Sequence, residues 1–306
     1  MIDLSNIFQQ LINGLTLGAT YGLIAIGYTL VYGILGMINF AHGDIYMISA
    51  YLTAICLATC TFFGVNALSV SLGITFIFAL LMTGLYGFAL ERIAYRPLRH
   101  STRLAPLISA IGMSLVLENF VRITQGARDQ ALPVILSGEI ILGKGSHLVQ
   151  ISYLQLAIII ATVISMTLLS FIITKTTFGR TMRAIQLDMS MAQILGVNAN
   201  QIIPMVFVIG AMMAAIAGTL TSLYYGSFDF SIGFIIGIKA FTSAVLGGIG
   251  SMVGAMLGGL LLGLAESLFS GFISVDYKDV FAFIVLILVL IFKPTGLLGT
   301  KEIEKV

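Results

Sequence analysis

The sequence predicts an all-α polytopic membrane protein with about eight or nine transmembrane helices, with broken or re-entrant helices among them as an alternative. Hydrophobic residues make up 58% of the chain, charged residues make up 9%, and the mean hydropathy is +1.07. An ordinary soluble domain carries about 25% charged residues. The charges are also clustered, and one helical span needs about 20 apolar residues, so each charge-free stretch holds at least one span. These stretches are residues 4–43, 45–90, 145–174, 189–228 and 240–265.

Several other classes of protein are disfavoured. The stretches are continuously apolar and do not alternate, which favours helices over a β-barrel. A net charge of +2 is too small to indicate a nucleic-acid partner. Cys56 and Cys60 lack metal or redox spacing, which indicates packing. The first ten residues have no basic n-region and no cleavage site, so we expect the first apolar stretch to be retained in a single transmembrane domain of residues 1–306, surrounded by lipid.

Basic residues in short loops set the orientation of a membrane protein. Placing residues 92–103, residues 175–201 and the C-terminus in the cytoplasm puts ten of the fifteen Lys and Arg inside. The N-terminus and a loop around residues 125–150 then lie outside. Nine crossings result, or eight if residues 41–63 or 231–247 are broken or re-entrant. The expected spans are residues 9–35, 41–63, 68–91, 104–123, 151–174, 203–223, 231–247, 252–272 and 279–293.

A polar stretch from Lys175 to Gln201 interrupts the apolar sequence. Apolar residues recur within it at helical spacing and a Gly-Val-Asn stop follows, which predicts a short helix over residues 184–195. We expect this segment, about residues 179–200, to lie at the cytoplasmic mouth of a channel, where a soluble partner binds it. The apolar positions are Ile185, Met189, Ala192 and Leu195, and the charged positions are Lys175, Arg180, Arg183 and Asp188.

Two charged residues lie deep in predicted spans. A charge at a helix centre costs about 2.5–3.5 kcal/mol in the membrane, so such residues face a partner or a wet cavity. We expect Lys239 and Glu266 to form an intramembrane ion pair, with a place beside the translocation route as the alternative.

The sequence also suggests residues for a translocation path or hinge. Asn39, His42 and Asp44 surround a break at Gly43, which suits a hinge or a pore-lining turn; His42 is either a hydrogen-bonded interface residue or a proton relay. Ser109 and Gly112 offer a second candidate lining segment.

Glycine patterns suggest close helix packing and an internal repeat. Gly250, Gly254 and Gly258 form a small-residue face, which indicates packing within the chain or, as the alternative, a subunit interface. Residues 39–43 (NFAHG) resemble residues 229–233 (DFSIG), and each follows a glycine-rich helix. In transporters the broken helices of such repeats meet near the substrate path. A chance match is the alternative.

No motif for catalysis or metal binding stands out. Residues 138–145 approach a phosphate-binding loop, but Gly145 occupies the position of the Ser or Thr that would bind magnesium. We therefore expect no cofactor or metal on this chain. Without an energy source of its own, a transport protein of this kind needs a soluble ATPase acting on the polar stretch.

Seven motifs spread over the chain resemble those of one family. They are TLGATYGLIAIGYTLVYGILGMINFAHGD, AYRPLR, SAIGMSL, GRTMRA, FVIGAMMAAIAG, KAFTSAVLGGIGS and KPTGLLG. Together they resemble the permease subunits of high-affinity branched-chain amino-acid ABC importers, LivH type, from about Gly14 to the last residues.

This resemblance implies a non-catalytic subunit in a bacterial inner membrane. Its partners would be a second related permease, two soluble ATPase subunits that hold ATP and magnesium, and a periplasmic binding protein that delivers Leu, Ile or Val. Importer permeases carry a Glu-Ala-Ala-x-x-x-Gly loop that contacts the ATPase, and here only Ala192 and Gly196 match it. The expected ATPase-coupling residues are Arg180, Arg183, Asp188, Met191, Ala192, Leu195 and Gly196.

The same architecture also serves other substrates, because fold does not fix function. A permease for urea, short amides or sugars is the main alternative. An ion-coupled carrier working alone and a structural membrane scaffold are alternatives of other classes.

Overall fold

The computed structural model describes residues 4–65, 67–99, 101–102, 104–133, 138–142 and 148–299, and it is mainly helical. Nine apolar helices in this part of the chain coincide in sequence with the nine expected spans. Seven of them are long and apolar enough to cross a membrane, whereas α9 and α11, with 16 and 15 residues, are shorter. The nine are α1 (Leu4–Leu35), α2 (His42–Phe62), α3 (Leu68–Leu90), α4 (Leu104–Gln125), α5 (Tyr153–Lys175), α8 (Ala199–Tyr225), α9 (Ile232–Gly247), α10 (Met252–Phe272) and α11 (Lys278–Phe292).

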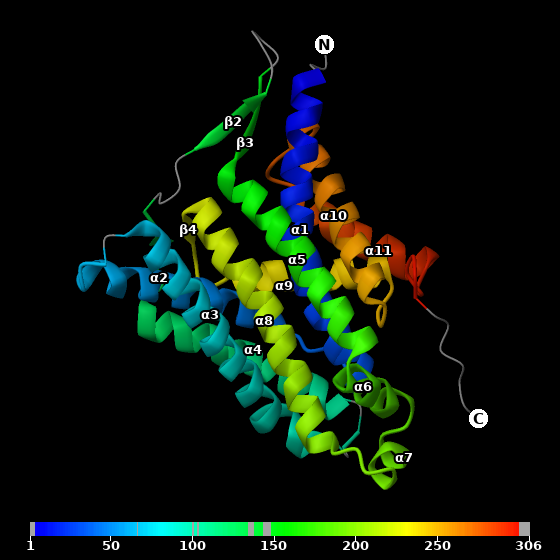
Figure 1. Cartoon of the computed structure of the whole chain (residues 1–306). Helices are drawn as coiled ribbons and strands as arrows, with labels where there is room; N and C mark the ends of the chain where they lie inside the picture. The colour runs from blue at the N-terminus through cyan, green and yellow to red at the C-terminus, as the bar shows by residue number, and fades with distance from the viewer. Residues whose placement is uncertain are drawn as a thin grey trace.

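The ends of the bundle agree with the predicted orientation. Figure 1 shows the start of α1 and strands β2 and β3 at one end, and the short helices α6 and α7 at the other. The basic region around residues 92–103, which we call the first basic loop, contains η1 (Glu91–Tyr95) and η2 (Arg96–Leu98). Its Arg99 donates to Asn200 at the start of α8, over 2.9 Å, so this loop lies at the same end as α6 and α7. Two of the regions predicted to be cytoplasmic therefore lie together.

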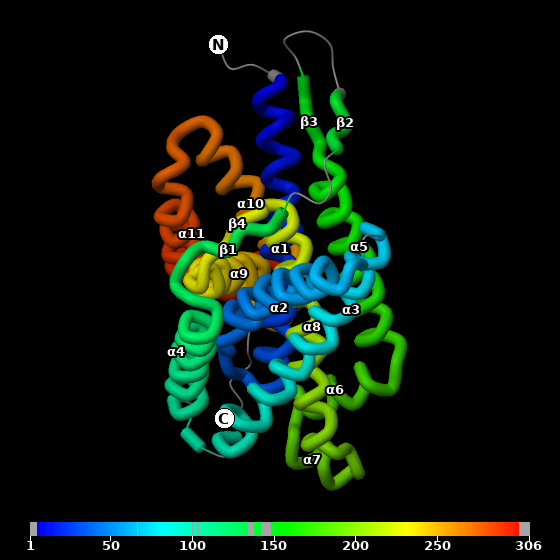
Figure 2. Tube along the Cα trace, turned by 90° about the vertical axis from the view of Figure 1, so that its left-hand side faces the viewer, coloured from blue at the N-terminus to red at the C-terminus, as the bar shows by residue number. Residues whose placement is uncertain are grey.

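The chain contains an inverted structural repeat. Helices α1 and α8 run in opposite directions, and each is followed by a helix that lies across the bundle, α2 or α9 (Figures 1 and 2). Gly36 and Gly226 both have positive φ, 63° and 69°, and both precede the next helix by six residues, 36 to 42 and 226 to 232. Helix α1 packs along α10, as α8 packs along α3. The two similar sequence segments thus occupy matching positions.

Glycines allow α2 and α9 to cross at backbone contact. A Cβ atom added to Gly43 would lie only 2.6 Å from the Cα of Gly237, and one added to Gly237 would lie 3.0 Å from the Cα of Gly43. Gly254 and Gly258 pack in the same way against Gly247, which agrees with packing within the chain. Van der Waals contact of this kind is what holds helices together in lipid, where no hydrophobic force drives them together.

The predicted single helix over residues 184–195 is wrong. The polar stretch instead forms two helices, α6 (Thr177–Leu187) and α7 (Met189–Ile194), separated by Asp188. Asp188 has an extended backbone, and its carboxylate caps α7 by accepting the Met191 N–H over 2.9 Å. An Asp at this position satisfies an N–H that the start of a helix leaves without a partner, so it favours a new helix over the continuation of the first. We call α6 and α7 with Asp188 the hairpin.

Short strands at the opposite end were not predicted. Strands β2 (Glu139–Leu142) and β3 (Val149–Ser152) form an antiparallel pair, and β1 (Gln130–Ala131) pairs with β4 (Ser227–Phe228). Strand β2 includes part of the sequence that approaches a phosphate-binding loop, whereas Gly143 to Gly145 lie outside the described residues.

Replacing Gly43 with Ala tests the helix crossing. We expect the variant to lose about 1–3 kcal/mol of stability, because the added methyl group overpacks the contact with α9. The matched control is Gly112→Ala, since nothing lies within 4 Å of a Cβ at Gly112. Thermal unfolding of the purified proteins in detergent measures both. Equal unfolding temperatures for the two variants would contradict the crossing.

Candidate functional site

Four of the six residues predicted for a path or hinge meet where α2 begins. Asn39, His42 and Asp44 are each 1% exposed, and Gly43 contacts α9. The Tyr95 hydroxyl donates to Asn39 Oδ1 over 2.9 Å, and the His42 ring meets the Tyr28 ring edge-on at 5.0 Å. This polar cluster therefore lies at the break between α1 and α2, beside the helix crossing.

The other two predicted path residues lie elsewhere. Ser109 and Gly112 belong to α4, and Gly112 is exposed. The Ser109 hydroxyl donates to the carbonyl of Ala94 over 3.1 Å, so it joins α4 to the first basic loop. The structure does not bring this pair to the crossing.

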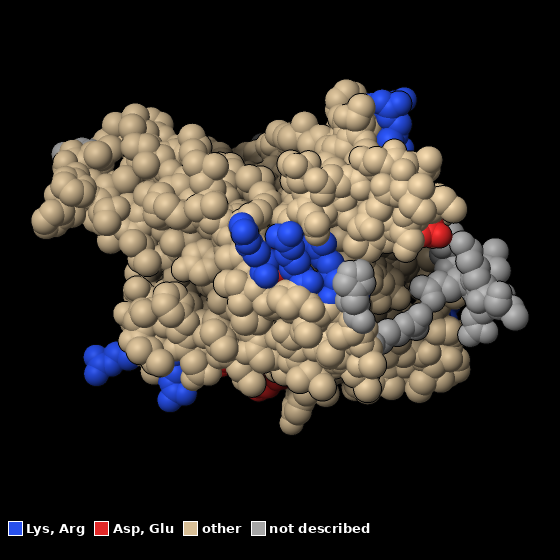
Figure 3. Space-filling model, turned by 90° about the horizontal axis from the view of Figure 1, so that it is seen from below, with Lys and Arg blue, Asp and Glu red and all other residues tan. Residues whose placement is uncertain are grey.

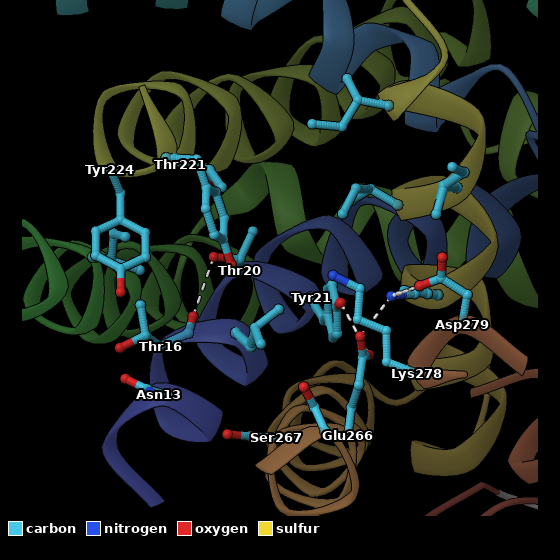
Figure 4. Close-up of a pocket in the computed structure, with 18 of the residues that line it drawn as sticks. Asn13, Thr16, Thr20, Tyr21, Thr221, Tyr224, Glu266, Ser267, Lys278 and Asp279 are labelled. Atoms are coloured by element: carbon cyan, nitrogen blue, oxygen red, sulfur yellow. Dashed lines mark hydrogen bonds and ion pairs between the residues drawn. The ribbon is translucent and has the colours of Figure 1, made fainter. Parts of the chain in front are cut away.

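Lys239 and Glu266 lie in contact, as expected, and two further residues join them. Lys239 Nζ is 2.6 Å from Glu266 Oε1 and 2.5 Å from Asp279 Oδ1, while the Tyr21 hydroxyl donates to Glu266 Oε2 over 3.0 Å (Figure 4). The side chains of Lys239 and Glu266 are 3% and 2% exposed, whereas Asp279 is 38% exposed. One ammonium group is thus shared by two carboxylates. Sequence reasoning missed Tyr21 and Asp279.

This cluster lies in the wall of a cavity of about 510 Å³ between α1, α5, α8, α9, α10 and α11. Such a volume is typical of a site for a small molecule. Figure 4 shows polar side chains converging on the cavity from several helices. Its lining includes Asn13, Thr16, Thr20, Thr221, Tyr224, Ser267, Ser270 and Lys278 among the polar residues, and Leu17, Ile158, Ile232, Ile235 and Ile236 among the apolar ones.

The hairpin presents an apolar surface that differs from the predicted one. Two of the residues expected on its exposed apolar face, Ile185 and Ala192, are buried at 3% and 2% exposure. Because the chain turns at Asp188, the exposed apolar side chains come from the last residue of α6, from α7 and from the residue after α7. They are Leu187, Met191, Ile194 and Leu195, which are 55–79% exposed.

The other predicted coupling residues have separate places on the hairpin. Arg180 is exposed, and Arg183 donates to the carbonyl of Ile173 at the end of α5. Gly196 ends α7 with a φ of +89°. Figure 3, seen from this end of the molecule, shows Lys and Arg side chains in the middle of the face and at its edges, with few Asp or Glu.

The first basic loop contacts both the start of α8 and the polar cluster at the start of α2. Arg99 forms an ion pair with Glu91, whose side chains are 5% and 0% exposed, and it also reaches Asn200 at the start of α8. Tyr95 of the same loop donates to Asn39. This loop therefore makes an exposed contact with the start of α8 and a buried contact with the break before α2.

Comparison with known proteins adds to this geometry. The family described as "Branched-chain amino acid transport system / permease component" matches residues 10–290. The chain belongs to this permease family. The permease is 49% identical to the high-affinity branched-chain amino acid transport system permease protein BraD of Pseudomonas aeruginosa over the whole of both chains. It is 50% identical to the permease protein LivH of Salmonella typhimurium and of Escherichia coli K12 over 97% of each chain. No solved structure matches it.

These relatives and the seven membrane-length helices identify a multi-pass inner-membrane protein that serves as a transport subunit. In the described residues the permease has a polar cavity near the end that carries β2 and β3, and an exposed hairpin at the opposite end.

Replacing Lys239 with Met tests the buried ion cluster. The change leaves Glu266 and Asp279 without their shared cation, and breaking a buried ion pair costs about 3–5 kcal/mol. We expect a clearly lower unfolding temperature by circular dichroism in detergent. The double variant Lys239→Met, Glu266→Gln should recover part of the loss, because coupled residues are not additive. Additive losses would contradict direct coupling.

Proposed function

We propose that this chain is the permease subunit of an ATP-driven importer for the branched-chain amino acids Leu, Ile and Val. It forms the translocation path together with a second, homologous permease. A periplasmic binding protein delivers the substrate, and two soluble ATPase subunits, which hold ATP and magnesium, supply the energy. The full-length similarity to the BraD and LivH proteins supports the substrate class.

The proposed contact with the ATPase rests on the exposed apolar residues Ile194 and Leu195, which we call the tip of the hairpin. Ile194 and Leu195 are 79% and 77% exposed, and Arg180 of the same hairpin is exposed as well. Large apolar side chains gathered on an exposed protrusion mark an interaction site. The ATPase is the occupant that a non-catalytic transport subunit requires at its cytoplasmic end. The apolar tip enters a groove on the ATPase, and the exposed Arg180 of α6 adds a positive charge to the same hairpin.

The hairpin acts as a lever because helices leave it on both sides. Helix α5 enters the hairpin at Lys175, and α8 leaves it at Ala199. Closure of the two ATPases pushes the hairpins of the two permeases together, and this tilts α5 and α8. Switching a two-state equilibrium from 1:99 to 99:1 requires about 5.5 kcal/mol. ATP binding and hydrolysis supply free energy of this size, so the permease needs no energy source of its own.

Assembly and uptake test the proposal directly. The purified permease, expressed with its partners, should bring down two ATPase subunits and a second permease. Proteoliposomes containing the complex should take up Leu, Ile and Val when ATP and the loaded binding protein are present. Uptake of urea, short amides or sugars in place of these amino acids would refute the substrate class. Uptake by the permease alone would indicate an ion-coupled carrier.

Charged substitutions at the hairpin tip test the coupling surface. We expect Ile194→Glu or Leu195→Glu to reduce uptake by about tenfold or more, since a central apolar contact contributes about 2 kcal/mol or more to an interface. The matched control is Gln193→Glu, which adds the same charge at a neighbouring exposed position of α7. ATPase co-purification and leucine uptake are the measurements. Normal uptake by the tip variants would exclude this surface as the ATPase contact.

Gly196→Pro and Ala192→Glu test the shape of the hairpin. Proline cannot adopt the φ of +89° found at Gly196, and Glu does not fit the buried position of Ala192. We expect both variants to insert into the membrane but to uncouple ATP hydrolysis from uptake. Membrane fractionation, ATPase activity and uptake are compared in the same preparation. Full uptake by both variants would reject the lever.

A further inference from the structure

The ion cluster in the cavity wall contains two carboxylates but one ammonium group, so its positive and negative charges are unequal in number. Among the residues that the structure describes, Lys239 is the cation that contacts both Glu266 and Asp279. Glu266 is fully engaged, because Lys239 contacts one of its oxygens and Tyr21 donates to the other. Asp279 differs, since it is 38% exposed and contacts Lys239 through Oδ1. A ligand in the cavity can therefore replace the contact between Lys239 and Asp279 and leave the Lys239–Glu266 pair intact.

The neighbouring hydroxyl groups present acceptors to the cavity. Thr16 donates to Ile12 and Thr20 donates to Thr16, in each case to the carbonyl one turn earlier in α1. Their protons are used within the helix, so the hydroxyl oxygens that line the cavity are available to accept hydrogen bonds. Together with Asp279 they form a wall suited to a group that carries several N–H donors.

An apolar wall completes the lining. Leu17, Ile158 and Ile236 line the same cavity as the ion cluster. A ligand that matches all of these features carries a cationic donor group, an anionic group and an aliphatic side chain.

We propose that this cavity holds the amino acid during import and that the zwitterion enters between Lys239 and Asp279. This proposal rests on the proposed import function and adds the site. The α-carboxylate accepts from Lys239 Nζ, the α-ammonium group donates to the Asp279 carboxylate, and the aliphatic side chain contacts the apolar wall. One ion pair is replaced by two, and no net charge is added to the membrane interior. The large cost of an unpaired charge at membrane depth is thereby avoided.

The variant Asp279→Asn tests the pairing with the ammonium group. It keeps the Lys239–Glu266 pair, so Lys239 still has a charged partner in the variant. We expect leucine uptake by the complete complex, at saturating loaded binding protein, to fall by about tenfold or more, because removing one partner of a buried charge pair costs several kcal/mol. The matched control is Asp276→Asn, the same change at an exposed position outside the cavity lining. Uptake by Asp279→Asn within about twofold of the control would overturn the proposal.

A labelling experiment tests binding in the cavity without transport. Ser270 lines the cavity and Ser274 does not, so Ser270→Cys is the reporter and Ser274→Cys is its control, with Cys56 and Cys60 replaced by Ala. Leucine should slow the reaction of Ser270→Cys with a water-soluble methanethiosulfonate in the complete complex and leave Ser274→Cys unchanged. Isocaproate, which lacks the ammonium group, and isopentylamine, which lacks the carboxylate, should give little protection.

The outcomes separate the two proposals. If the unsubstituted complex imports leucine but leucine gives no protection at Ser270→Cys, the cavity is not the site and the import function stands. Equal protection by leucine and both analogues would overturn the zwitterion pairing. If the unsubstituted complex imports no leucine, the import function fails, and the amino-acid site fails with it.

Discussion

The contact between α2 and α9 is the constraint on which the rest of this structure depends. At Gly43 and Gly237 the two backbones touch, and any larger side chain would separate the helices. In lipid no hydrophobic force drives helices together, so contact of this kind supplies their attraction. Because α9 lies across the bundle here, Lys239 faces Glu266 of α10 and Asp279 of α11. The polar cluster at the start of α2 is buried by the same crossing.

The two halves of the repeat share an arrangement of helices but carry different side-chain interactions at equivalent positions. When α2 and α9 are aligned at their first residues, Ser49 and Lys239 occupy equivalent positions, each seven residues after the start of its helix (42 to 49, 232 to 239). Ser49 donates to the carbonyl of Tyr46 within its own helix, whereas Lys239 holds two carboxylates. The cavity that contains the ion cluster is lined by residues of α9 and by none of α2. One short sequence match indicated the repeat, but only the packing of α1 on α10 and of α8 on α3 distinguishes it from chance.

Local signals in the sequence predicted much of the fold. Apolar length and clustered charges placed the nine apolar helices, because each signal lies within its own segment. The Lys239–Glu266 contact followed from the cost of two opposite charges at membrane depth. Asp279 was missed because it stands at the start of a span, where a charge is ordinary. Thr16 and Thr20 were missed because a Thr in an apolar helix bonds its own backbone, and only the arrangement of six helices shows that it lines a cavity.

The cavity and the hairpin lie at opposite ends of the same two helices. Helix α5 contributes Ile158 to the cavity and α8 contributes Thr221 and Tyr224, while the other ends of both helices join the hairpin. Near the cavity the helices are tied together, since Gln155 of α5 donates to the Tyr224 hydroxyl and to Asn13 of α1, over 3.0 Å in each case. In the proposed lever, a displacement of the hairpin would move two walls of the cavity together, and the contacts of Gln155 would carry that movement to α1. Helices α5 and α8 would thus link the two sites without any direct contact between them.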